Sequence, residues 1–169
     1  MTPSLSVLIP SKGRASLGKT LSSVHGQLEA GDELIVDVND DSPWGNRARN
    51  RMMPRAKGAF LLFIDDDDIY YPDALRYVRR AVTPGERAVH IFRMRYPNGK
   101  VLWSIPNVVE NNVSTQMIAV PNLELGRWGE RYAGDFDFIE ETVLLSGCEP
   151  VFHEEHLVRI GHDQGTPSV

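Results

Sequence analysis

The segment FLLFIDDDDIYYPD, from Phe60 to Asp73, joins an apolar run to four consecutive aspartates, Asp65 to Asp68. Phe60 to Ile64 are all apolar, which is typical of a strand buried on both faces of a sheet. Adjacent carboxylates repel one another, so a folded chain places them where solvent or a cation offsets the repulsion. In an open α/β sheet, ligands bind at the carboxyl ends of the strands. We therefore interpret the aspartates as a divalent-metal site that holds a diphosphate, with a solvated acidic loop as the alternative.

The residues before this segment predict a β-α-β unit. Leu5 to Ile9 form a short β-rich apolar run, and apolar residues with helical spacing follow from Leu17 to Leu28. The next apolar run is Leu34 to Val38, so the two strands should be parallel and joined by a right-handed crossover. The second strand leads into the polar loop NDDSPWGN, which carries Asp40 and Asp41. Acidic groups at the ends of two different strands indicate a single cleft.

Two helices are predicted on either side of the acidic segment. The first lies within residues 44–56, where Pro54 should end it, and the second spans residues 70–82. The first is rich in arginine, and most of these side chains should form a solvated face. Arg47 and Arg51 lie one turn apart near its start, beside the acidic strand ends. For these two, phosphate contact and solvent exposure are equally good interpretations.

The second half of the chain has a mixed pattern. Residues 88–95 and 100–105 are strand-like and flank an Asn-Gly turn, which indicates a hairpin. We interpret residues 113–120 as a further strand, residues 134–147 as a helix that begins with GDFDF, and LVRI, residues 157–160, as a last strand. The chain has no internal repeat or low-complexity segment. One domain with a β-α-β half and a mixed half is therefore expected.

The composition is that of a soluble globular protein of one domain. The 169 residues are 41% hydrophobic and 24% charged, with a formal net charge of -5, so a polyanion would need a local basic patch. The single Cys148 cannot form an internal disulfide, and the N-terminal residues lack the pattern of a signal peptide. No apolar run reaches the roughly 20 residues that cross a bilayer. We expect a cytoplasmic protein without a transmembrane segment.

The order and spacing of these elements resemble those of the family-2 glycosyltransferases of GT-A type. The shared features are a first strand like SVLIPSKGR, Gln27 near the end of the first helix, acidic residues after the second strand, ARN at 48–50, A-x-G at 56–58, and a strand that ends in a DxD motif. The resemblance covers about residues 4–82, and later only GDFDF and the terminal LVRIGHDQGTPS. It implies one α/β domain of GT-A type over residues 1–169, with a Rossmann-like mixed sheet flanked by helices. Its first half, about 1–85, would bind the nucleotide, and about 86–169 would bind the acceptor and carry the catalytic base.

The resemblance also implies the residues of the donor site. Asp66 would contact the ribose, and Asp67 would bind a Mn²⁺ or Mg²⁺ that bridges the diphosphate, with Asp65 as the next candidate. His162, in the terminal loop, would complete the coordination of the metal. The other nucleotide-binding residues would be Pro10, Ser11, Arg14, Asp40, Asp41, Arg47 and Arg51, with the choice between the two adjacent aspartates left open.

In this family a carboxylate at the start of a late helix is the catalytic base of inverting enzymes, and GDFDF resembles that site. Asp135 occupies the place of the base, but a glycine precedes it where glutamate is common, so Asp137 is the second candidate. A helix N-cap is the alternative role for Asp135. Trp103, Trp128 and Tyr132 could stack on an acceptor sugar or base, or they could belong to the core or the cleft wall.

The function implied is a metal-dependent, inverting transfer of a sugar from a nucleoside diphosphate sugar, preferably a UDP-sugar, to an acceptor hydroxyl. The acceptor could be a carbohydrate, a lipid-linked or other small molecule, or a hydroxymethylated DNA base. The DNA acceptor is considered because compact bacteriophage relatives modify such bases, and arginines at 47–55 and 76–80 could contact the backbone. The alternatives are a nucleotidyltransferase, for which the SKGR loop is too short, and a sugar-nucleotide-binding module without activity.

Overall fold

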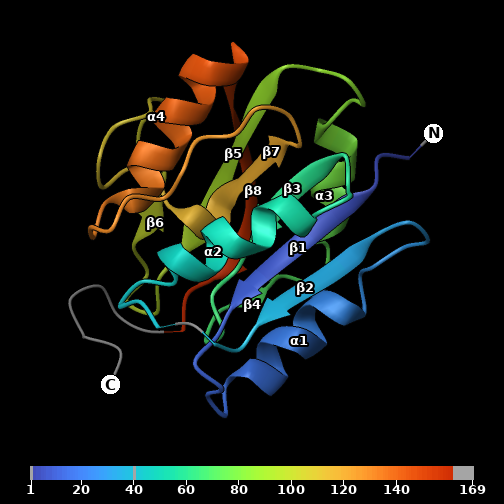
Figure 1. Cartoon of the computed structure of the whole chain (residues 1–169), viewed down its shortest axis with the longest axis vertical. Coiled ribbons are helices and arrows are strands. Elements are labelled where there is room, and N and C mark those ends of the chain that lie inside the picture. The colour runs from blue at the N-terminus through green and yellow to red at the C-terminus, as the bar shows by residue number, and fades with distance from the viewer. Residues whose placement is uncertain (1, 40, 162–169) are drawn as a thin grey trace.

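The computed structural model describes residues 2–39 and 41–161, and its first half is the predicted β-α-β unit (Figure 1). Strand β1, Leu5–Pro10, is followed by helix α1, Leu17–His25, and strand β2, Glu33–Asp37. Strands β2 and β3, Phe60–Phe63, pair in parallel with the two sides of β1. All residues of β1 and β3 are buried, as their apolar runs predict. The carboxyl ends of the three strands therefore lie at one edge of the sheet.

Two short helices follow the predicted positions closely. Helix α2, Asn46–Met52, gives way to a 3₁₀ turn, Met53–Arg55, because Pro54 lacks the N–H that would continue the helix. Helix α3, Ala74–Ala81, begins four residues later than expected, because Ile69–Tyr70 form the short strand β4. No helix in the described part of the chain is long and apolar enough to span a membrane.

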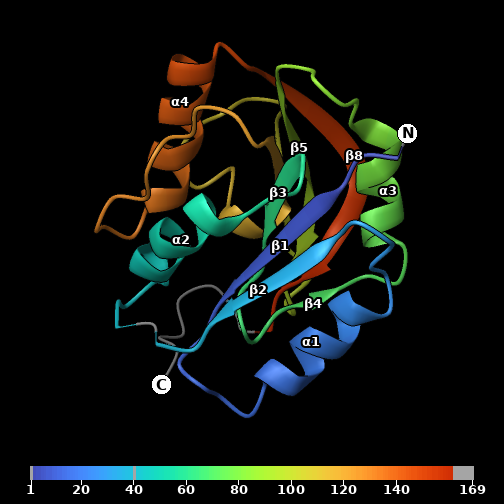
Figure 2. The ribbon, with the colours of Figure 1, turned by 45° about the vertical axis from the view of Figure 1, so that its right-hand side comes forward.

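The second half extends the sheet with strands of both directions. Strand β7, Ile118–Pro121, pairs antiparallel with β3, and β5, Ala88–Arg95, pairs antiparallel with β7. Strand β8, Glu149–Arg159, runs parallel to β5, and the short β6, Val101–Leu102, pairs with β5. The strand order over the described residues is β2-β1-β3-β7-β5-β8-β4. Helices α2 and α4, Gly134–Ser146, cover one face of the sheet and α1 and α3 the other (Figure 2), which confirms the predicted mixed α/β fold.

Two expected strands are shorter than predicted. Residues 113–117 do not belong to β7, because the backbone N–H of Ser114 donates to Met117 Sδ at 3.1 Å and a 3₁₀ turn forms there. The expected strand 100–105 is reduced to β6. The residues that follow β6 bond the side chain of Asn112 with their backbone instead of continuing the strand. Asn112 Oδ1 accepts the N–H of Ser104 at 2.8 Å, and its Nδ2 donates to the carbonyl of Ile105 at 2.8 Å. Residues 103–105 and 113–117 therefore lie in loops and turns instead of strands.

Strand β8 is longer than the expected LVRI. It begins at Glu149, and its first half, which includes the apolar residues Val151 and Phe152, is largely exposed. This half is held by backbone pairing with β5, from Ala88 opposite Glu149 to Ile91 opposite Phe152, with a bulge further along. The first half of the strand was missed because its apolar residues, Val151 and Phe152, form neither an alternating pattern nor a long apolar run.

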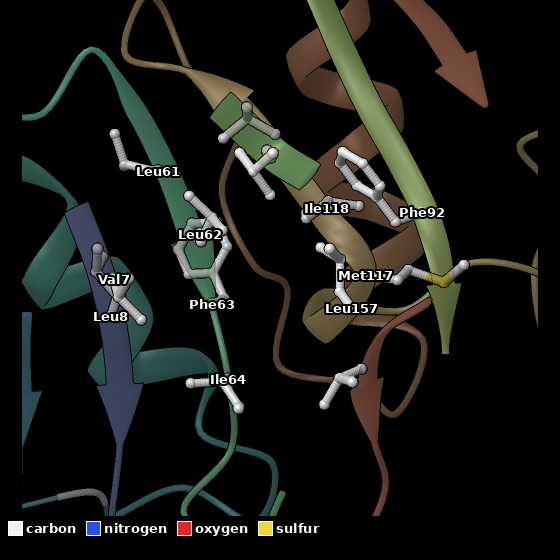
Figure 3. Close-up of a cluster of buried hydrophobic side chains, with 14 of the residues drawn as sticks. Val7, Leu8, Leu61, Leu62, Phe63, Ile64, Phe92, Met117, Ile118 and Leu157 are labelled. Atoms are coloured by element: carbon white, nitrogen blue, oxygen red, sulfur yellow. The ribbon is translucent and has the colours of Figure 1, made fainter. Parts of the chain in front are cut away.

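The core occupies both faces of the sheet. Figure 3 shows side chains of neighbouring strands meeting there, among them Val7, Leu8, Leu61, Leu62, Phe63, Ile118, Phe92 and Leu157. Trp128 stacks on Phe138 of α4 with ring centroids 3.6 Å apart, and Phe63 meets Trp128 edge-on at 4.6 Å. These rings attach α4 to β3, so the start of α4 is held near the acidic end of β3.

Gly58 lies where the chain enters β3 against β1, and this position requires glycine. A Cβ at Gly58 would lie 2.5 Å from the backbone nitrogen of Ser6. We expect Gly58→Ala to lower the free energy of unfolding by about 2 kcal/mol, because backbone atoms cannot move aside cheaply. The control Gly18→Ala, in the first turn of α1 with no atom within 4 Å, should raise it by about 0.5 kcal/mol. Urea unfolding measures both, and a stabilising Gly58→Ala would contradict this packing.

Candidate functional site

A cavity of about 610 Å³ lies at the carboxyl edge of β1 and β3. It is lined by Pro10 at the end of β1 and Ser11 after it, Asp65 to Asp67 after β3, the loop before α2, parts of residues 111–116, and the start of α4. The volume lies within the usual range of small-molecule sites. The sheet thus brings segments that are far apart in the sequence to one cavity.

Asp66 and Asp67 form an acidic wall of this cavity. Asp66 is 4% exposed, and its Oδ2 accepts hydrogen bonds from the hydroxyl of Ser11 at 2.7 Å and the backbone N–H of Lys12 at 3.3 Å. Arg14 Nη1 lies 3.4 Å from Asp66 Oδ1 and 3.1 Å from Asp67 Oδ2. A positive charge therefore bridges the two carboxylates.

This pair fits the predicted metal. Carboxylate oxygens are the ligands that Mg²⁺ and Mn²⁺ prefer, and Mg²⁺ is commonly held by one or two carboxylates plus substrate phosphates. Within residues 2–39 and 41–161, no group of three His, Cys, Asp or Glu side chains could hold a metal ion. The predicted ligand His162 and the predicted nucleotide contact Asp40 lie outside the described residues.

Asp65 also lines the cavity, but protein side chains bind both of its oxygens. Its Oδ1 accepts a hydrogen bond from Arg49 Nη2, and its Oδ2 accepts one from Gln116 Nε2 at 2.7 Å. Arg49 is 2% exposed and also donates to the carbonyl of Trp44 at 2.6 Å and to Asn46 Oδ1 at 3.0 Å. The buried arginine thus joins the end of β3 to the start of α2.

We expect Arg49→Met to lower the free energy of unfolding by about 3 kcal/mol, because it removes one partner of a partly buried ion pair. Arg47→Met is the matched control on the same helix, since its pairs with Asp41 and Glu130 are exposed and should contribute less than about 1 kcal/mol. Chemical denaturation of the two variants and the wild type measures the difference. Similar small losses for both would contradict the structural role of Arg49.

Asp68 is fully buried and serves the fold. Its Oδ1 accepts the backbone N–H of Gly161 at 2.8 Å, and its carbonyl accepts the hydroxyl of Thr20 at 2.8 Å. These bonds join the acidic turn to α1 and to the end of β8. Asp65 and Asp68 therefore bond different parts of the protein, whereas Asp66 and Asp67 share Arg14.

Asp135 lies in the first turn of α4 and lines the same cavity. Ala133 occupies the N-cap, so the alternative role of Asp135 as a helix cap is wrong. Burial raises the pKa of Asp135 above its ordinary value, against hydrogen bonds from the N–H of Phe136 and the Ser114 side chain and the charge of Arg49. A carboxylate with a raised pKa on a cavity wall has the properties of a general base.

The other candidates for catalysis and acceptor binding lie in different environments. Asp137 is outside the cavity lining and accepts hydrogen bonds from Arg131 Nε at 2.7 Å and Nη2 at 2.5 Å. Tyr132 lines the cavity and is 66% exposed. Trp103 and Trp128 are 6% and 2% exposed and belong to the core. Of the three aromatic candidates, Tyr132 alone is placed to meet a ligand in this cavity.

Arg47 and Arg51 are outside the cavity lining and bind carboxylates. Arg47 donates from Nε and Nη2 to Glu130, both at 2.9 Å. Arg51 Nε donates to Asp37 at 3.0 Å, and its Nη1 donates to Asp41 at 3.4 Å. A hydrogen bond from its own backbone N–H and one from Arg51 lower the pKa of Asp41. Both arginines thus join protein segments to each other.

Several residues that line the cavity were not identified from the sequence, among them Trp44, Asn46, Ser114 and Gln116. Asn46 Nδ2 donates to the carbonyl of Gly129 at 2.8 Å, which fixes the loop before α2 against the loop before α4. Ser114 and Gln116 lie inside the segment that was predicted to be a strand. The polar run Ser-Thr-Gln interrupts the apolar pattern of this segment, and it could have indicated that these residues are not part of the strand.

The sequence matches the model of the family described as glycosyl transferase family 2 over residues 44–140, more than half of the 169 residues. The matched range begins just before α2, includes the four aspartates and ends within α4. No curated protein matches the sequence.

Solved structures of S. aureus TarS share the fold. One superposes with a TM-score of 0.71 at 16% identity and covers 94% of this chain. TarS 1-349 in complex with UDP-GlcNAc gives a TM-score of 0.69 at 15% identity over 97% of this chain, and the complex with UDP gives 0.65 at 14% over 92%. The chain spans 37% of the first of these structures and 60% of each of the other two.

Proposed function

The chain belongs to glycosyl transferase family 2, and we propose that its cavity transfers a sugar from a UDP-sugar to an acceptor hydroxyl with inversion at the anomeric carbon. The observation that carries this proposal is that Asp66, Asp67 and Asp135 line one cavity. Two of the TarS structures of the same fold are complexes, one with UDP-GlcNAc and one with UDP, which supports a UDP-sugar as the donor.

Asp67 is the residue that would hold a Mn²⁺ or Mg²⁺, with Asp66 toward the ribose. The Asp67 side chain is 20% exposed, whereas that of Asp66 is 6% exposed and already bonded to Ser11. When bound, the ion would stabilise the negative charge that grows on the leaving diphosphate. Lys12 and Arg14 also line the cavity and add positive charge to the same wall.

Asp135 is the proposed general base. In the reaction the acceptor oxygen forms a bond to the anomeric carbon while the bond from that carbon to the diphosphate oxygen breaks. The hydroxyl proton passes to the carboxylate of Asp135, and the electron pair of the broken bond remains on the diphosphate. Attack opposite to the leaving group inverts the anomeric carbon, and a placed general base contributes about 10²–10⁴-fold to the rate.

The raised pKa of Asp135 gives a pH dependence with a defined sign. The base acts in its ionised form, so kcat/KM should fall as the pH decreases through a pKa above the ordinary 3.8 of aspartate. Ser114→Ala removes a hydrogen bond that lowers this pKa, so the acid limb of the profile should move to higher pH. An acid limb that moves to lower pH in Ser114→Ala would contradict the assignment.

The acceptor is proposed to be an uncharged carbohydrate or small molecule. Of the arginines expected to meet a DNA backbone, five are engaged by carboxylates: Arg47, Arg49, Arg51, Arg76 and Arg79. The Arg79 pair is buried, and the net charge of -5 gives no general attraction to DNA. The exposed aromatic side chains Trp44 and Tyr132 line the cavity instead, and such rings stack on sugars.

Two assays separate this function from its alternatives. In the first, the protein receives UDP-sugars, Mg²⁺ and a panel of carbohydrate and hydroxymethylated DNA acceptors, and released UDP is measured. In the second, it receives UTP and sugar 1-phosphates, and released pyrophosphate is measured. The proposal expects UDP in the first assay and no pyrophosphate in the second. Pyrophosphate release would establish a nucleotidyltransferase, and donor binding without release of UDP would indicate a binding module.

A further inference from the structure

Arg14 occupies the position between the two carboxylates that face the cavity. It comes from the loop after β1, and its Nη1 lies 3.4 Å from Asp66 Oδ1 and 3.1 Å from Asp67 Oδ2. Its side chain is 27% exposed, so the guanidinium is in contact with the cavity and its solvent. One nitrogen of Arg14 thus contacts both carboxylates at once.

Asp66 is held in this contact by other parts of the protein, whereas Arg14 reaches it through a long side chain. Asp66 is held by the hydroxyl of Ser11 and the N–H of Lys12, and Ser11 is itself 2% exposed. Arg14 reaches the pair from a loop through a flexible side chain. A guanidinium also binds phosphate oxygens in the same bidentate manner as carboxylates, so a diphosphate would be an equivalent partner.

We propose that Arg14 and the divalent cation compete for the Asp66–Asp67 pair, and that the diphosphate of the donor takes over Arg14 as the cation binds. The inference rests on the proposed function, because it requires a metal and a diphosphate in this cavity. Two cations at one carboxylate pair repel each other, so Arg14 lowers the affinity for metal when no nucleotide is present. The diphosphate supplies Arg14 with a new partner, so nucleotide and metal should each strengthen the binding of the other.

The test measures metal binding without nucleotide. Mn²⁺ is titrated into the wild type and Arg14→Gln, and free Mn²⁺ is followed by its electron paramagnetic resonance signal. We expect Arg14→Gln to bind Mn²⁺ about tenfold more tightly than the wild type, within the range of ordinary coupling between sites. The control Lys12→Gln removes one positive charge from the same loop, but the contact of Lys12 with Asp66 is made by its backbone. Lys12→Gln should therefore change the affinity much less.

Unchanged or weaker Mn²⁺ binding in Arg14→Gln would overturn the inference, as would an equal gain in Lys12→Gln. A second titration, of UDP at saturating Mn²⁺, should show weaker UDP binding in Arg14→Gln, because the diphosphate loses its arginine. Thermal unfolding confirms that each variant is folded. If the wild type binds no UDP with Mn²⁺, the proposed function fails. If it does and Arg14→Gln keeps the wild-type affinity for Mn²⁺, only the competition fails.

Discussion

Asp135→Asn is expected to reduce the turnover of sugar transfer by about 10²–10⁴-fold while the affinity for UDP with Mn²⁺ stays within about twofold of the wild type. Asparagine keeps the shape of the side chain, and its oxygen can still accept the backbone N–H of Phe136, which lies 2.9 Å from Asp135 Oδ1. It cannot take a proton from the acceptor hydroxyl. Steady-state transfer rates and calorimetric titration of UDP measure the two quantities.

Asp137→Asn is the control for this prediction. Asp137 lies two residues later in α4, outside the cavity lining, and is paired with Arg131. Its variant should retain most of the activity. Full activity in Asp135→Asn would remove Asp135 as the base, and a collapse confined to Asp137→Asn would move that role to Asp137.

Asp67→Asn is expected to abolish the metal-dependent part of nucleotide binding. The substitution removes the charge of the proposed ligand and leaves a neutral amide, which is a weaker partner for a hard cation. Calorimetric titration of UDP with and without Mn²⁺ should therefore give the same weak affinity in the variant, whereas Mn²⁺ should strengthen binding to the wild type. Asp73→Asn, at an exposed ion pair with Arg76, should behave as the wild type. Unchanged metal-dependent binding in Asp67→Asn would shift the metal to Asp65 or Asp66.

The first half of the fold could be predicted from the sequence because its signals are local. The run of β3 is entirely apolar and that of β1 contains only one polar residue, Ser6, since both strands are buried on both faces. Pro54 ends α2 through its own covalent structure. The second half was predicted less well because its elements depend on distant partners. The exposed first half of β8 is a strand because it pairs with β5, and Asn112 shapes its loop by bonding residues five to eight positions earlier.

The acidic site could be located from the sequence, but its four aspartates could not be distinguished. Their different surroundings come from residues far away along the chain: Asp65 contacts Arg49 and Gln116, and Asp68 contacts Gly161. No local pattern carries this information. The resemblance to the family gave Asp66 and Asp67 their proposed roles, and the structure places these two beside Arg14 on the cavity wall.

The roles of the aromatic candidates for acceptor binding could not be distinguished from the sequence either. Trp103 and Trp128 carry large apolar rings that suit either a ligand or a core, and the sequence around each does not separate the two. Trp128 packs between Phe138 and Phe63, of which Phe63 is remote in sequence, and Trp103 meets Phe152 of β8. Burial against such partners is a property of the folded chain. Trp44 is exposed in a polar loop, and the sequence did not indicate that its ring would line the cavity.

A thermal-shift measurement with UDP, GDP and dTDP, each with and without Mn²⁺, tests whether this cavity is a metal-dependent nucleotide-sugar site. A ligand present at 100 times its dissociation constant stabilises the folded state by about 2.7 kcal/mol, which corresponds to a shift of several degrees in Tm. We predict that UDP raises the Tm by this amount with Mn²⁺ and by much less without it, and that GDP and dTDP have smaller effects. No shift with any nucleotide, or a shift with UDP that is the same without Mn²⁺, would contradict the proposed site.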